Sequence, residues 1–62
     1  MEFKQGDTLI SSYTDTVNKV TENKLYTVDK VNEEGFCIVN DDGVEVYPNE
    51  SSFTKLEFNG IF

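Results

Sequence analysis

Two turn motifs of the form Asn-X-X-Gly lie eight residues apart in the second half of the chain, at 32–35 and 40–43. In each motif the asparagine side chain can bond the backbone of its own turn, and the glycine can take the positive φ that returns the chain to the ladder. The segment between them, 36–39, is apolar and β-forming. Strands joined by such tight turns pair antiparallel. The motifs therefore predict a β-meander.

The other strand segments are short and rich in β-branched or aromatic residues, and several alternate apolar with polar side chains. With the central segment they give five expected strands, at 8–11, 24–31, 36–39, 44–47 and 54–58. The inward faces of these strands and Phe53 give the expected core: Leu9, Tyr26, Val28, Phe36, Ile38, Val44, Val46, Phe53 and Leu56. Both faces of 36–39 are apolar, so the opposite register, with Cys37 and Val39 inward, also stays open.

Two connections are not hairpin turns. Residues 12–23 are mostly polar and predict a long loop that enters the core at Val17 or Val20. Pro48 ends the fourth strand because proline lacks the ladder donor. Residues 49–53 are too few for an α-helix but carry capping side chains, and they predict one 3₁₀ turn.

Length and charge narrow the class of protein. We expect one small domain over 1–62, with its core in 6–58, because a chain of 62 residues has no room for a second core. Twelve acidic residues against five basic ones give a net charge of −7. Such a field repels nucleic acid and anionic membranes and attracts basic protein surfaces. A single cysteine, Cys37, and the absence of a long apolar run predict a soluble cytoplasmic protein.

The residues needed for catalysis are missing from the sequence. There is no histidine, Cys37 lies in an apolar strand, and the serines have no base beside them in the sequence. The acidic pairs at the two turn tips lack the spacing of a calcium loop and are expected to be solvated. We therefore predict no enzymatic activity, no cofactor and no metal site.

Aromatic residues outside the expected core suggest a binding surface. Tyr13 lies in the polar loop, and strand alternation turns Tyr47 outward next to Pro48. Flanked by Asp15 and Glu50, the two tyrosines would suit a partner that carries lysine or arginine. The alternative is that Tyr13 folds over the edge of a small core.

Several segments together resemble a known group of proteins. They are 6–10, 24–28, the two acidic glycine turns, and Val46-Tyr47-Pro48-Asn49 through Phe53. This arrangement resembles the small Src-homology-3-like barrel proteins of unknown role encoded by tailed bacteriophages. The resemblance implies an all-β fold, a five-stranded antiparallel barrel with a 3₁₀ turn before the last strand, in the cytoplasm of a bacterial host cell. The chain lacks the tryptophan pair of the peptide-binding members, which argues against proline-rich ligands.

Two functions follow as hypotheses. The first is a non-enzymatic protein–protein interaction module, a phage accessory or host-takeover protein that binds a basic host or phage protein through Tyr13, Asp15, Tyr47, Pro48 and Glu50. The second is an acidic decoy that imitates nucleic acid and inhibits a host DNA-binding enzyme. The decoy surface would comprise Glu33, Glu34, Asp41, Asp42 and Glu45. Neither hypothesis involves direct binding to nucleic acid or to a membrane.

Overall fold

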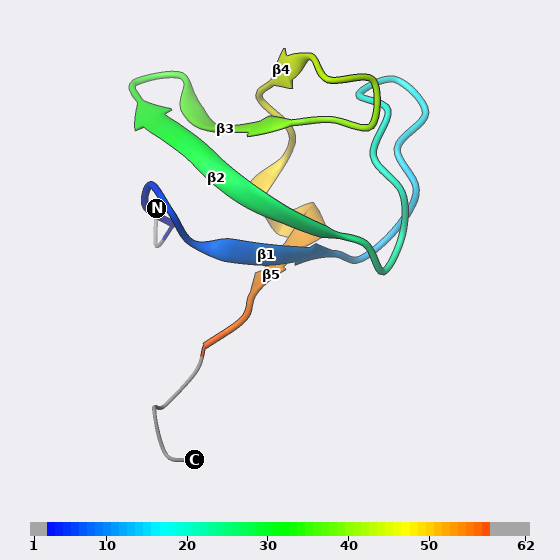
Figure 1. Cartoon of the computed structure of the whole chain (residues 1–62), viewed down its shortest axis with the longest axis horizontal. Coiled ribbons are helices and arrows are strands. Elements are labelled where there is room, and N and C mark those ends of the chain that lie inside the picture. Colours follow the sequence, from blue (N-terminus) through cyan, green and yellow to red (C-terminus); the bar gives the residue numbers. More distant parts are fainter. Residues whose placement is uncertain (1–2, 58–62) are drawn as a thin grey trace.

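Five antiparallel strands and one 3₁₀ helix make up the fold in the computed structural model, which describes residues 3–57 (Figure 1). In chain order the elements are β1 (Thr8–Ser11), β2 (Leu25–Asn32), β3 (Gly35–Val39), β4 (Glu45–Val46), the 3₁₀ helix η1 (Glu50–Ser52) and β5 (Phe53–Lys55). The all-β class, the antiparallel five-stranded sheet and the 3₁₀ turn before the last strand are thus confirmed. No helix among the described residues is long and apolar enough to cross a membrane.

The strand order is β4-β3-β2-β1-β5, so β2 lies at the centre. Residues 25–27 of β2 pair with β1, and residues 28–32 pair with β3. The register shifts between Val28 and Lys30, which marks a bulge at Asp29. The terminal strands β4 and β5 lie on opposite sides of the molecule (Figure 1) and do not pair with each other. The described sheet is therefore open, and its closure into a barrel stays a prediction.

Both hairpin turns have the expected chemistry. The side chains of Asn32 and Asn40 each accept a hydrogen bond, 2.9 Å long, from the backbone N–H two residues further on. Gly35 has a φ of 127° and Gly43 a φ of 79°. Because residues with a Cβ adopt such angles at a cost, these two glycines are required by the backbone.

Replacing Gly43 with alanine should destabilise the protein by about 1 kcal/mol. No atom lies within 4 Å of the place that a Cβ would occupy, so the loss would come from backbone strain and not from a collision. Gly43→Asn is the matched control, because asparagine tolerates positive φ. Urea denaturation measures both, and an alanine variant as stable as wild type would contradict the turn assignment.

The core agrees with most of the sequence-based expectations. Six of the expected core residues are buried: Leu9, Tyr26, Val28, Phe36, Ile38 and Phe53. Val46 is half-buried and packs against this cluster, and Leu56 is half-buried. Ile38 is fully buried whereas Val39 is 45% exposed, which confirms the register with Ile38 inward. Cys37 is also buried but lies outside the core cluster, on the opposite face of β3.

The prediction that Val44 lies in the core is wrong, since this residue is 54% exposed. The reason is the side chain of Asn40, whose Oδ1 accepts a hydrogen bond from the Val44 N–H at 2.9 Å. The Val44 carbonyl in turn accepts from the Asn40 N–H at 2.8 Å. These bonds extend the turn through Val44, so β4 begins at Glu45 and not one residue earlier.

The long loop enters the core through Val20, which is 2% exposed, and not through Val17, which is 86% exposed. Backbone hydrogen bonds of 2.8 and 3.0 Å join Asp15 and Val20, and they close a small hairpin with Val17 at its tip. At the other end of the chain, β5 covers Phe53–Lys55 and is shorter than the expected 54–58. Residue 58 lies outside the described residues.

Candidate partner-binding surface

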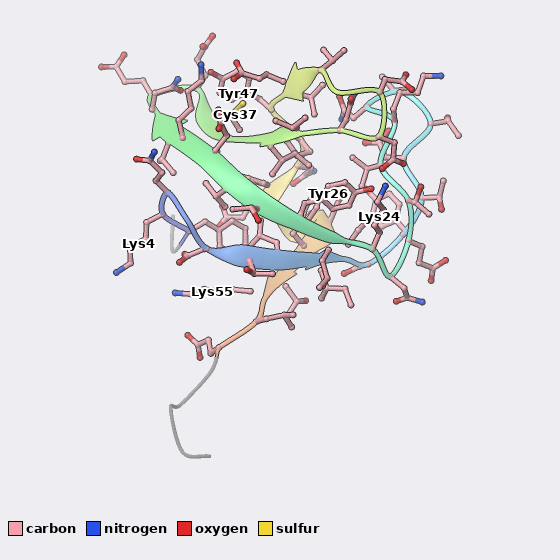
Figure 2. All side chains as sticks on the ribbon, in the orientation of Figure 1. Lys4, Lys24, Tyr26, Cys37, Tyr47 and Lys55 are labelled. Atoms are coloured by element: carbon pink, nitrogen blue, oxygen red, sulfur yellow. The ribbon has the colours of Figure 1, made fainter. Side chains whose placement is uncertain are left out.

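Tyr47 is an exposed ring that is fixed in place. It follows β4 and is 39% exposed, and its Oη accepts a hydrogen bond from Asn32 Nδ2 at 2.9 Å. The next residue, Pro48, is buried and restricts the backbone beside the ring. Figure 2 shows Tyr47 on the side of the molecule where β3 and β4 lie. Because both its hydroxyl and its backbone are held, the ring would lose little entropy when a partner covers it.

Tyr13 is held by a different part of the fold. It is 50% exposed, and its Oη accepts a hydrogen bond from Ser52 Oγ at 2.7 Å. The Ser12 N–H donates to the Ser52 carbonyl at 2.8 Å, so the start of the long loop is attached to η1. The structure thus groups Tyr13 with η1, which contains the exposed Glu50, and links Tyr47 to β2.

The Asp15 carboxylate accepts its hydrogen bonds from residues of its own loop. It accepts hydrogen bonds from the Val17 N–H at 3.0 Å, the Asn18 N–H at 3.1 Å and Asn18 Nδ2 at 2.8 Å. The Asn18 N–H is the largest of the causes that lower the pKa of Asp15. Asp15 therefore shapes the loop next to Tyr13, and Pro48, being buried, positions Tyr47 without being exposed itself.

Asp41, a residue of the expected decoy surface, has a structural role that the sequence does not indicate. Its carboxylate accepts hydrogen bonds from Lys24 Nζ at 2.6 Å, Thr21 Oγ1 at 2.6 Å and Tyr26 Oη at 2.8 Å. Lys24 contributes most to holding the pKa of Asp41 at about 2, followed by Thr21 and Tyr26. Lys24 and Tyr26 lie next to the long loop (Figure 2). Asp41 is exposed and ionised, as expected for this turn, but its three hydrogen-bond partners were not expected.

The acidic residues proposed for the decoy do not form one continuous surface. Glu33 and Glu34 are exposed at one end of β3, and Asp42 is exposed at the other end. A five-residue strand such as β3 spans about 17 Å. Glu45 forms an ion pair with Lys30 at 3.2 Å, and Asp41 is paired with Lys24. Two lysines therefore interrupt the negative surface.

Cys37 lies next to two carboxylates, a cluster that the sequence does not reveal. Ligand atoms of Asp29, Cys37 and Glu45 lie within 4.8 Å of one another, because the bulge places Asp29 over β3. The ammonium group of Lys30 binds Glu45 at this point. Burial raises the pKa of the Cys37 thiol, so the protonated thiol is neither a good nucleophile nor a good metal ligand at neutral pH.

Comparisons of the chain with family models, with curated proteins and with solved structures give no match. The functional assignment therefore depends on the geometry described above. That geometry offers an exposed aromatic ring fixed by Asn32 and Pro48, in a protein with a net charge of −7. An aromatic ring of this kind is a typical anchor of a protein–protein interface.

Proposed function

We propose that this protein is a non-enzymatic interaction module that binds a protein with a basic surface. Tyr47 is its anchor, with Tyr13, Asp15 and Glu50 as further contacts and Pro48 as support. The observation that carries the proposal is the Tyr47 ring, 39% exposed yet held through its hydroxyl by Asn32. The resemblance to small Src-homology-3-like barrels adds the proposal that it is a phage accessory protein acting in the host cytoplasm.

The charge of the protein supports the choice of partner. Three of the lysines already form ion pairs, Lys24 with Asp41, Lys30 with Glu45, and Lys55 with Asp7 and Glu57. The remaining net charge of −7 attracts a basic protein and accelerates its encounter with the module. Because lysines divide the acidic residues of the two turns, we favour an interface centred on Tyr47 over a uniform imitation of nucleic acid.

Replacing Tyr47 with alanine should remove binding while leaving the fold intact. The protein is immobilised and exposed to bacterial lysate, and retained proteins are quantified by mass spectrometry. We expect wild type to retain a basic protein that Tyr47→Ala retains at least about tenfold less. Tyr47→Phe should keep most of the binding, because it retains the ring. Circular dichroism spectra of both variants should match that of wild type.

The matched charge control is the pair Glu33→Lys and Asp42→Lys. Both residues are exposed. Asp41 is left unchanged because it accepts a hydrogen bond from Tyr26, so replacing it would alter the fold as well as the charge. Under the proposal the charge variant slows association, and raising the salt from about 0.05 to 0.3 M weakens binding only modestly. If the charge variant loses the partner, Tyr47→Ala keeps it, and DNA competes for it, the decoy hypothesis replaces this proposal.

A further inference from the structure

The outer edge of β5 presents backbone groups that β1 does not use. The Leu56 N–H donates to the Thr8 carbonyl at 2.9 Å, and the Ser12 N–H donates to the Ser52 carbonyl at 2.8 Å. In an antiparallel pair, residues alternate between facing the neighbouring strand and facing away from it. The peptide groups of Ser52, Thr54 and Leu56 therefore face β1, and those of Phe53 and Lys55 face away.

Within the sheet of the described residues, β5 is a terminal strand and pairs only with β1. The Phe53 N–H is used locally, because it donates to the Glu50 carbonyl at the end of η1. The Phe53 carbonyl and both backbone groups of Lys55 thus lie along the edge of the sheet. An edge of this kind is a template for pairing with another extended segment.

A groove runs beside this edge, with a cavity volume of about 360 Å³. Its apolar part is formed by Phe3 and Phe53, and its polar part by Glu50, Thr54, Lys55 and Glu57. Both rings pack edge-on against Phe36. The ring centroid of Phe36 lies 5.1 Å from that of Phe3 and 5.5 Å from that of Phe53. The apolar part of the groove is therefore backed by the core and offers a surface for an apolar side chain.

The charge around the groove favours a basic occupant. Glu50 and Glu57 are exposed on its rim. The one lysine of the lining, Lys55, has its Nζ 3.5 Å from Asp7 Oδ2 and 3.9 Å from Glu57 Oε1. Its charge is thus offset within the protein, and the rim stays negative overall. Figure 2 shows Lys55 on the opposite side of the molecule from Tyr47, so this groove is separate from the proposed anchor.

We propose that the β5 edge binds an extended basic peptide segment by adding it to the sheet as a further strand. The segment pairs with the backbone of Phe53 and Lys55, places an apolar side chain next to Phe3 and Phe53, and sets lysine or arginine against Glu50 or Glu57. This surface goes beyond the proposed function, with which it shares only Glu50. It stands whether or not Tyr47 binds a partner.

The probe for this surface is a fluorescein-labelled hexapeptide of alternating lysine and valine, measured by fluorescence polarisation with the full chain. We expect a dissociation constant below about 1 mM, and at least about tenfold weaker binding of the same peptide with glutamate in place of lysine. Two further peptides are N-methylated on all lysines or on all valines. Only one of these removes the N–H groups that face β5, so one should bind like the parent and the other at least about tenfold more weakly.

Substitutions in the protein test the same β5 edge as the changes to the peptide. Lys55→Pro removes an N–H that faces away from β1, at a position where an edge strand tolerates proline. Lys55→Gln removes the same charge and keeps the N–H. We expect Lys55→Pro to weaken probe binding at least about tenfold and Lys55→Gln to leave it unchanged or slightly stronger. Tyr47→Ala should leave it unchanged, which separates this proposal from the first.

Amide chemical shifts of wild type, recorded as the probe is added, give a readout that does not depend on whether a variant folds. The largest changes should occur at Lys55 and Glu57. Changes centred on Asn32 and Tyr47, equal weakening by both N-methylated peptides, or no binding at about 1 mM probe would each overturn the proposal. A dimer in light scattering that Lys55→Pro dissociates would instead assign the edge to a second copy of the chain, and would also overturn it.

Discussion

Replacing Ile38 with alanine should unfold most of the protein at 37 °C. Ile38 is fully buried in β3, where it pairs with Val28 of β2 on one side and with Val46 of β4 on the other. Truncating such a residue costs about 2–5 kcal/mol, because apolar burial is lost and a cavity remains. A domain of this size has only about 3–5 kcal/mol of stability from its core. Thermal unfolding followed by circular dichroism measures the loss.

The control for this experiment is the next residue along the same strand. Val39→Ala changes a side chain that is 45% exposed on the opposite face, so its effect should stay within about 0.5 kcal/mol. If Ile38→Ala were as stable as Val39→Ala, the assignment of Ile38 to the core would be wrong.

Acid should destabilise the protein through Asp41. The pKa of Asp41 is lowered from 3.8 to about 2 in the folded protein, so folding favours the ionised form. The resulting stabilisation is fully present above about pH 4 and is lost as the pH falls from about 4 towards 2. Asp7 and Asp15 also have lowered pKa values and act in the same direction. Melting temperatures of wild type should therefore fall across this range.

The variant Asp41→Asn isolates the contribution of this one carboxylate. At neutral pH it should melt several degrees below wild type, because Lys24, Thr21 and Tyr26 lose their charged acceptor. Its melting temperature should also depend less on pH between about 4 and 2. Asp42→Asn, at the adjacent exposed position, should behave like wild type. An Asp41→Asn variant that kept the full acid dependence would show that other groups are responsible.

The parts of the fold that could be predicted from sequence are those with local causes. Asn32 and Gly35, and likewise Asn40 and Gly43, determine their turns through bonds and dihedral angles within a few residues. Strand alternation fails at Val44 because the Asn40 side chain prolongs the turn through this residue. The closure of a barrel needs contacts between the two ends of the strand order, and no local pattern specifies them.

The candidate sites show the same limit. Strand alternation in β4 predicts that Tyr47 faces outward. It does not predict that Asn32, 15 residues away in the chain, donates a hydrogen bond to the Tyr47 hydroxyl. The partners of Asp41 lie 15 to 20 residues away and come from the loop and from β2. Nothing in the spacing of these residues marks them as neighbours. The cluster at Cys37 cannot be predicted from the sequence for a further reason, because it depends on the bulge at Asp29.

The central position of β2 in the sheet has a consequence for how the protein unfolds. One half of this strand serves β1 and the other serves β3, so it is the only direct link between the two three-stranded parts of the described sheet. If either part unfolds, β2 loses the backbone hydrogen bonds that it makes to that part. β2 also contains Tyr26 and Val28 of the core. We therefore expect local fluctuations to be greatest in the loops and the edge strands. We therefore expect the loss of β2 to unfold the whole domain in a single cooperative transition.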